Sequence, residues 1–145
     1  MKIGIVSDHR GYELKQKIIK TMKNIDFIDY GTNSKESVDY PDYAFKLSKE
    51  VKNKKVDLGI AICGSGIGMS IACNKVKGIR CARVTSIKDV KITKKDNNAN
   101  IIAFSSEINF SKVKRMIEEF INTEFLNEER HSKRINKILE YEINN

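Results

Sequence analysis

Short apolar runs alternate along the chain with longer segments in which apolar residues recur every three or four positions. The apolar runs predict strands at residues 2–7, 26–31, 58–63, 80–84 and 100–105. The run 58–63, "LGIAIC", is apolar at consecutive positions, so both of its faces would be buried. That pattern is typical of a central strand in a parallel sheet.

The segments between these runs have helical periodicity. Over residues 12–24, Leu14, Ile18 and Met22 fall on one helical face. Comparable patterns predict further helices after Pro41, from the glycine-rich loop at 64–68 to about residue 75, over 86–96, over an apolar stripe from 113 to 121, and from about residue 127 onward. The last of these would be an additional C-terminal helix.

This strand–helix alternation predicts an α/β fold, a three-layer sandwich with a five-stranded parallel sheet and helices on both faces. No linker, repeat or low-complexity stretch interrupts it, so residues 1–145 are expected to form a single domain. Ligands of such sheets bind beyond the carboxyl ends of the strands. Two strand ends carry candidate chemistry, "SDHRG" after the first strand and "CGSGIG" after the third.

Charge narrows the class of partner. The 145 residues have a formal net charge of +8, which suggests nucleic acid or a phosphorylated small molecule as the partner. Many of the lysines are scattered over helical segments, as in Lys15, Lys17, Lys20 and Lys23, and such spacing favours a solvated face. No stripe of aromatic and basic residues is present, so we do not expect nucleic acid binding.

Other features exclude several classes of protein. No apolar run is long enough to span a membrane, and the start of the chain is too short in apolar residues for a signal peptide, so a cytoplasmic protein is expected. Three cysteines, Cys63, Cys73 and Cys81, have no CxxC spacing, which argues against a disulfide framework and against a zinc site.

The glycine-rich loop does not match the common nucleotide motifs. The first strand–helix turn lacks GxGxxG, and the loop at 64–68 lacks the lysine and serine of a P-loop. A glycine turn that leads into a helix presents backbone N–H groups and a positive dipole end to an anion. Alternatively, the glycines only permit a tight turn. The residues alone leave both interpretations open.

Several side chains near the predicted strand ends are candidates for function. Cys63 directly precedes the loop donors, where a helix N-terminus can activate a thiol, whereas an inert core role is favoured for Cys73 and Cys81. His9 follows Asp8 at the end of the first predicted strand. It could have a structural role, or it could contact a bound ligand.

Two further pairs are open to two interpretations. Arg130 and Arg134 are four residues apart on the last predicted helix and would lie on one face of it. They could form a solvated pair, or they could bind a phosphate together. Tyr40 and Tyr43 flank Pro41, where packing around a turn is the expected role.

Seven segments together resemble one family. "SDHRGYELK", "DYGT", "DYPDYA", "ICGSGIG", "NKVKGIR", "NANIIAFS" and "RHSKRI" occur in the order found in ribose-5-phosphate isomerase type B, a family that also includes galactose-6-phosphate isomerase subunits. The resemblance covers essentially the whole chain. It implies a Rossmann-like domain, a homodimer or dimer of dimers with active sites shared between subunits, and no metal or cofactor.

The resemblance also implies roles around the glycine loop. Cys63 would be the base that moves a proton between C2 and C1 of the open-chain sugar. Ser65 and the loop amides, including those of Gly64, Gly66 and Gly68, would stabilise the enediolate oxygens. Independent chemistry agrees, because proton removal next to a carbonyl builds negative charge on oxygen and fixed N–H donors stabilise such charge.

The remaining implied contacts come from both subunits. Asp8 and Tyr43 would contact sugar hydroxyls, and His9 would face the phosphate. The neighbouring subunit would supply three groups, Arg130 and Arg134 to the phosphate and Asn97 to the sugar oxygens.

One position departs from the family pattern. Where the family usually has a histidine assigned to opening the furanose ring, "KKDNNAN" places Asp96. The resemblance implies interconversion of ribose 5-phosphate and ribulose 5-phosphate, a reaction of the pentose phosphate pathway. Two alternatives remain: a hexose 6-phosphate (galactose or allose 6-phosphate) isomerase or a subunit of one, and a sugar-phosphate-binding protein with impaired catalysis. The chain keeps "DHRGYELK" after the first strand and "RHSKR" near the C-terminus, two segments in which galactose-6-phosphate isomerase subunits depart from the pattern. The resemblance therefore favours the pentose substrate.

Overall fold

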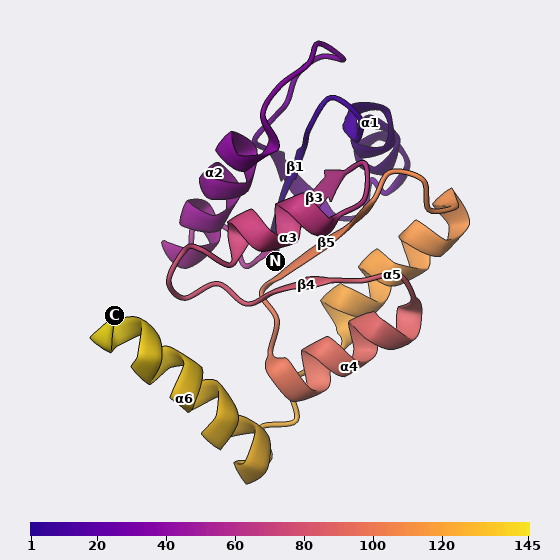
Figure 1. Ribbon diagram of the computed structural model, residues 1–145. Helices are drawn as coiled ribbons and strands as arrows, with labels where there is room; N and C mark the ends of the chain where they lie inside the picture. The colour runs from indigo at the N-terminus through magenta and orange to yellow at the C-terminus, as the bar shows by residue number, and fades with distance from the viewer.

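The computed structural model describes residues 1–145 and contains one parallel sheet (Figure 1). Its strands are β1 (Lys2–Ser7), β2 (Asp26–Asp29), β3 (Leu58–Cys63), β4 (Cys81–Arg83) and β5 (Ile101–Ser105), in the spatial order β2-β1-β3-β5-β4. Strand β3 is central, and all six of its residues are buried. The prediction drawn from its unbroken apolar run is therefore confirmed.

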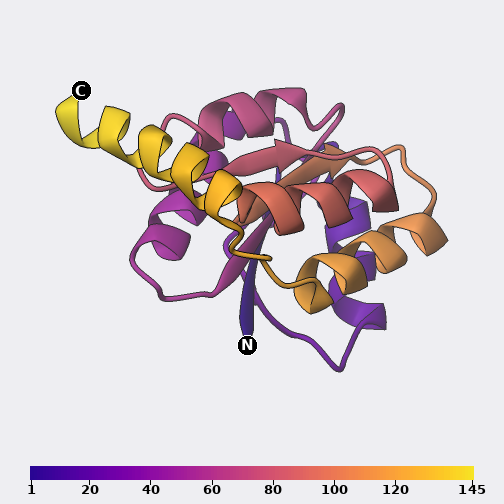
Figure 2. The ribbon, with the colours of Figure 1, turned by 90° about the horizontal axis from the view of Figure 1, so that it is seen from below.

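Helices cover both faces of the sheet, as the α/β prediction requires. They are α1 (Tyr12–Thr21), α2 (Tyr40–Lys52), α3 (Ile67–Cys73), α4 (Ile87–Asn97), α5 (Phe110–Asn122) and α6 (Glu129–Asn144). Helices α1, α4 and α5 contribute to the core on one face, and α2 and α3 to the core on the other. Helix α6 contacts α4 and extends beyond the sheet, as Figures 1 and 2 show.

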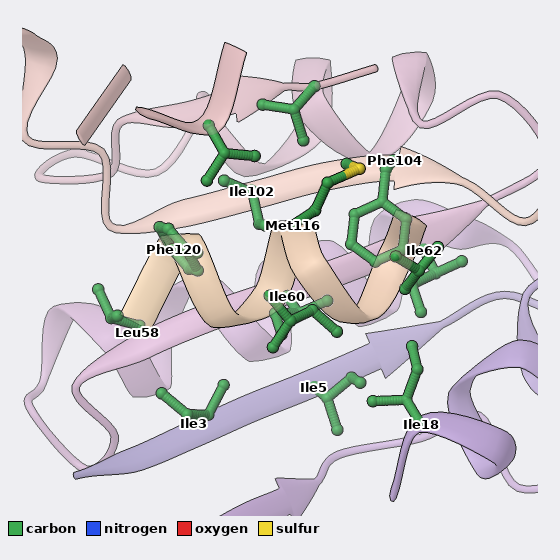
Figure 3. Packing of buried hydrophobic residues seen from close by; sticks show 14 of the residues in the cluster. Ile3, Ile5, Ile18, Leu58, Ile60, Ile62, Ile102, Phe104, Met116 and Phe120 are labelled. Atoms are coloured by element: carbon green, nitrogen blue, oxygen red, sulfur yellow. The ribbon is translucent and has the colours of Figure 1, made fainter. Parts of the chain in front are cut away.

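The larger core lies between the sheet and helices α1 and α5. Alternate residues of each strand project to this face, for example Ile3 and Ile5 of β1 and Ile60 of β3. Figure 3 shows them beneath Met116 and Phe120 of α5. The apolar stripe that predicted α5 thus forms its buried face.

Several predicted boundaries differ from the structure by a few residues. The helix predicted over 12–24 ends at Thr21, and the strands predicted over 26–31 and 80–84 are shorter at Asp26–Asp29 and Cys81–Arg83. These shifts occur at element ends, where polar residues provide little periodic signal.

Lys15 corrects the expectation that the scattered lysines form a solvated face. Its side chain is fully buried, and its ammonium group contacts both carboxylate oxygens of Asp29 at 2.6 and 2.7 Å. It also donates to the carbonyl oxygen of Thr32 at 2.8 Å. Lys17 and Lys20 on the same helix are exposed as expected. Lys15 instead fixes the segment that follows β2.

The strand order brings the loops after β1 and β3 together. The chain leaves β1 for β2 on one side, and β3 lies on the other, so a crevice opens where the connections diverge. The Asp8 amide donates to the Ile62 carbonyl at 3.1 Å across this junction. A Cβ atom at Gly11 would lie 2.7 Å from the Ile62 side chain, so the two loops approach closely. None of the helices has the length and apolar character needed to cross a bilayer.

Candidate active site

A cavity of about 290 Å³ opens at this junction of the two loops. We call it the thiol pocket; it is lined by Asp8, Arg10, Tyr40, Cys63, Gly64, Ser65 and Gly68. The last residue of β3 and the residue that follows β1 therefore face one space. The structure thus brings together most of the residues that the sequence placed near the glycine loop.

Cys63 is buried, and its position depends on the turn that follows it. Its sulfur accepts a hydrogen bond from the Gly66 amide at 3.1 Å. Gly66 has a left-handed backbone with φ of 78°, and a Cβ atom there would lie 2.7 Å from the Phe104 Cα. Glycine is therefore required on both conformational and steric grounds. The turn in this way directs an N–H donor at the thiol.

The loop also offers N–H groups that the protein itself leaves unpaired. The amides of Gly64, Ser65 and Gly68 donate to no acceptor within the chain, and all three residues line the thiol pocket. Other bonds hold the loop in place: the Ser105 hydroxyl donates to the Gly64 carbonyl at 2.6 Å, and Arg83 Nε donates to the Ser65 carbonyl at 3.2 Å. The arrangement suits an oxygen that develops negative charge in the pocket.

Asp8 lines the other wall of the thiol pocket, whereas the next residue, His9, lies outside the lining. Asp8 is buried, and its Oδ1 accepts the Gly11 amide at 3.0 Å, which leaves Oδ2 without a protein donor. His9 Nδ1 accepts the Val38 amide at 3.2 Å. A neutral imidazole that accepts at Nδ1 carries its proton at Nε2. His9 can therefore donate from Nε2 to an anionic group.

Two residues of the thiol pocket were missed by the sequence analysis. Tyr40, expected only to pack around the turn, lines the pocket, and its hydroxyl lies near Gly68. Tyr43, the expected hydroxyl contact, is absent from the lining and packs against Gly31 instead. Arg10 lies over Gly64. The only signal for these residues was their closeness in sequence to Pro41 and to His9.

A second and larger cavity, of about 560 Å³, lies between α4 and α6. We call it the α6 pocket; its polar lining includes Arg80, Asp96, Asn97, His131, Arg134 and Glu142. Arg80 Nε donates to the Asn97 carbonyl at 3.0 Å, so it caps the end of α4 and fixes Asp96 and Asn97. Burial lowers the pKa of Arg80.

The two pockets lie at opposite ends of the strands: the thiol pocket is at the carboxyl edge of the sheet and the α6 pocket at its amino edge. Cys63 pairs with Ser105 at the end of β5, whereas Asp96 and Asn97 precede the start of that strand at Ile101. Five strand residues at ~3.3 Å each separate the two edges by roughly 16 Å. One chain therefore does not bring Asp96, Asn97 and Arg134 to Cys63.

Arg130 and Arg134 do not converge on one point within the chain. Arg134 lines the α6 pocket, whereas Arg130 is exposed and its Nε contacts Glu128 at 3.1 Å.

The other two cysteines, Cys73 and Cys81, are buried in the core. The neighbouring thiol of Cys73, and then burial, raise the pKa of Cys81. No three His, Cys, Asp or Glu side chains gather in a metal-binding arrangement.

Comparison with known proteins decides the family. The family model described as "Ribose/Galactose Isomerase" matches residues 3–138. The chain belongs to this family. It is 45% identical to a protein named ribose-5-P isomerase B from Listeria innocua, over 73% of each chain.

Two solved structures extend the likeness to the whole chain. Ribose-5-phosphate isomerase B of Clostridium thermocellum is 41% identical with a TM-score of 0.95, over 99% of both chains. The Mycoplasma genitalium ribose-5-phosphate isomerase B, solved with bound ribulose-5-phosphate, is 38% identical with a TM-score of 0.91, over 99% of this chain and 97% of that one. The chain is thus an isomerase with the α/β fold of these enzymes, as the sequence resemblance implied.

Proposed function

We propose that the protein interconverts D-ribose 5-phosphate and D-ribulose 5-phosphate through an enediolate, with Cys63 as the base. The observation that carries the proposal is the Cys63 thiol beside unpaired loop amides in one pocket. The Mycoplasma genitalium relative with bound ribulose-5-phosphate supports the substrate.

The geometry suits a proton transfer between neighbouring carbons. Cys63 as thiolate removes the C2 proton of the open-chain aldose and returns it to C1, while the O2 hydroxyl proton passes to O1, so one base serves both carbons. The negative charge moves onto O1 and O2, where the amides of Gly64 and Ser65 can donate. The Gly66 amide donates to the sulfur and so fixes the position of the Cys63 side chain. Asp8 Oδ2 is placed to accept from a sugar hydroxyl.

The phosphate requires donors that the thiol pocket supplies only in part. His9 can offer its Nε2–H, and a second copy of the chain would add Arg130 and Arg134, together with Asp96 and Asn97 near the sugar. A homodimer or dimer of dimers with shared sites follows from this proposal, because the two pockets lie at opposite edges of one chain. A shared site also accounts for the charged lining of the α6 pocket.

A second candidate is a hexose 6-phosphate isomerase, for galactose or allose 6-phosphate. The description of the family model, which names galactose beside ribose, favours this alternative. The same base and amides would serve a longer sugar.

The three cysteines are all free thiols, which fits a reducing compartment and supports a cytoplasmic place in the pentose phosphate pathway.

Steady-state assays on the purified protein test the proposal. We expect kcat/KM for ribose 5-phosphate to exceed that for galactose 6-phosphate and allose 6-phosphate by at least tenfold. A preference for either hexose phosphate would replace the pentose assignment with the second candidate. Binding of ribose 5-phosphate without turnover would instead indicate a sugar-phosphate-binding protein.

A further inference from the structure

His131, in the first turn of α6, has a buried nitrogen that no hydrogen bond satisfies. The residue is 7% exposed, and its Nε2 lies 3.5 Å from Asp96 Oδ1 and 3.7 Å from Glu128 Oε2. Buried polar atoms are almost always paired, so an unpaired one calls for a specific explanation. Neither carboxylate is close enough for a well-formed hydrogen bond.

The pocket distinguishes the two carboxylates. Asp96 lines the α6 pocket together with His131, Asn97 and Arg134, whereas Glu128 does not. The Asp96 side chain is 41% exposed and that of His131 is 8% exposed. Both side chains line the pocket, but Asp96 is the more accessible of the two and His131 the more deeply buried.

The proposed substrate creates a need for this pair. Ribose 5-phosphate exists mainly as a furanose ring, and the C2 proton becomes acidic only in the open-chain aldehyde. Opening the ring moves a proton from the O1 hydroxyl to the ring oxygen. An isolated aspartate side chain has a pKa near ~3.9 and is therefore ionised at neutral pH. In that form it can accept a proton but has none to donate. An imidazole, with a pKa near ~6.5, can store one.

We propose that Asp96 and His131 hold one proton between them and open the furanose ring as a pair. Asp96 touches the sugar, and His131 is a positioning residue and proton store behind it. This inference rests on the proposed function and on its shared site, in which the pair is contributed by the neighbouring copy. It gives a role to a histidine for which the family resemblance implies none.

The step balances without any further reactant. The shared proton passes from Asp96 to the ring oxygen as the bond from C1 to that oxygen breaks. The O1 hydroxyl loses its proton to the Asp96 carboxylate as the C1=O1 double bond forms. The pair ends with one proton, which His131 can take back, and the sugar is the open-chain aldehyde.

Ring opening can be measured apart from isomerisation. The Cys63→Ala variant cannot move the C2 proton, but it keeps the Asp96–His131 pair. Because the two furanose anomers interconvert through the open chain, NMR magnetisation exchange between them reports ring opening directly. We expect Cys63→Ala protein to accelerate the exchange of ribose 5-phosphate at least tenfold over buffer. No acceleration would overturn the inference even if the parent protein isomerises ribose 5-phosphate, so the two failures are distinguishable.

Further variants in the Cys63→Ala background test the pair itself. His131→Gln and Asp96→Asn should each abolish most of the acceleration. Glu128→Gln, which alters the other carboxylate near Nε2, should leave it within twofold. Adding Asp96→His to the His131→Gln protein should restore exchange, because the new imidazole carries its own proton. Full acceleration in the His131→Gln protein would contradict the proposal. A second contradicting result would be no recovery of exchange when Asp96→His is added to His131→Gln, provided that this protein still binds inorganic phosphate with unchanged affinity.

Discussion

His9 accepts the Val38 amide through Nδ1 at 3.2 Å and so ties the loop after β1 to the segment before α2. The bond connects residues 29 positions apart in the sequence. It fixes the ring and leaves Nε2 as a donor. The proposed phosphate contact of His9 therefore depends on a backbone group that no motif in the sequence identifies.

A matched pair of variants separates the two nitrogens of His9. His9→Asn can retain the acceptor near Val38 but removes the Nε2 donor. We expect its KM for ribose 5-phosphate to rise at least tenfold, since a hydrogen bond to a charged group contributes roughly 1.5–3 kcal/mol. His9→Gln, which places its amide near Nε2, should be less impaired in binding. An unchanged KM in His9→Asn protein would remove His9 from the phosphate site.

Tyr40 is expected to contact the sugar in place of Tyr43. Tyr40→Phe removes a hydroxyl from the thiol pocket, so kcat/KM should fall about tenfold, or ~1.4 kcal/mol. Tyr43→Phe is the matched control and should stay within twofold of the parent, because Tyr43 packs against Gly31. Steady-state kinetics on both variants decide the matter. A larger loss in Tyr43→Phe would restore the assignment made from the resemblance.

The shared site can be tested by mixing inactive proteins. A dimer with one Cys63→Ala chain and one Arg134→Ala chain contains one intact site and one doubly altered site. Random exchange makes half of all dimers mixed, so about a quarter of the parent activity should return. Arg130→Ala mixed with Arg134→Ala is the control, because both changes affect the same side of each site. Recovery in the control mixture, or none in the first after verified exchange, would contradict the shared site.

Stability near α4 should depend on pH through Asp89. Its carboxylate accepts the Thr85 amide at 3.0 Å and the Thr85 hydroxyl at 3.1 Å, and the amide bond is the main reason why the Asp89 pKa is lowered. A depressed pKa stabilises the fold above the unfolded value and loses this effect as pH falls through the folded value.

Urea unfolding of Asp89→Asn checks this sign. The variant should lose about 0.5 kcal/mol of stability or less at pH 7, since solvent screens a partly exposed carboxylate. The difference should shrink below about pH 4, where the unfolded aspartate is protonated. Lys88→Ala, an exposed neighbour on α4, serves as the control. An equal loss at pH 7 and pH 3 would show that the charge of Asp89 is not responsible.

Much of the fold and part of the site could be predicted from local patterns. The unbroken apolar run of β3 determined its central place, and the glycines after Cys63 marked the turn that contacts it. The sequence could not predict the burial of Lys15, because its partners Asp29 and Thr32 lie on another segment. It also could not reveal that β3 pairs directly with β5, because the order of parallel strands in a sheet does not follow from their order in the chain.

The isomerisation rate of Cys63→Ala protein with ribose 5-phosphate tests the central claim most directly. We predict a loss of at least a thousandfold, or ~4 kcal/mol in barrier, in protein that remains folded and still binds a phosphosugar analogue. Cys73→Ala, which removes a buried core thiol outside both pockets, should keep most of the activity. A Cys63→Ala rate within tenfold of the parent would contradict the account, because another group would then move the proton.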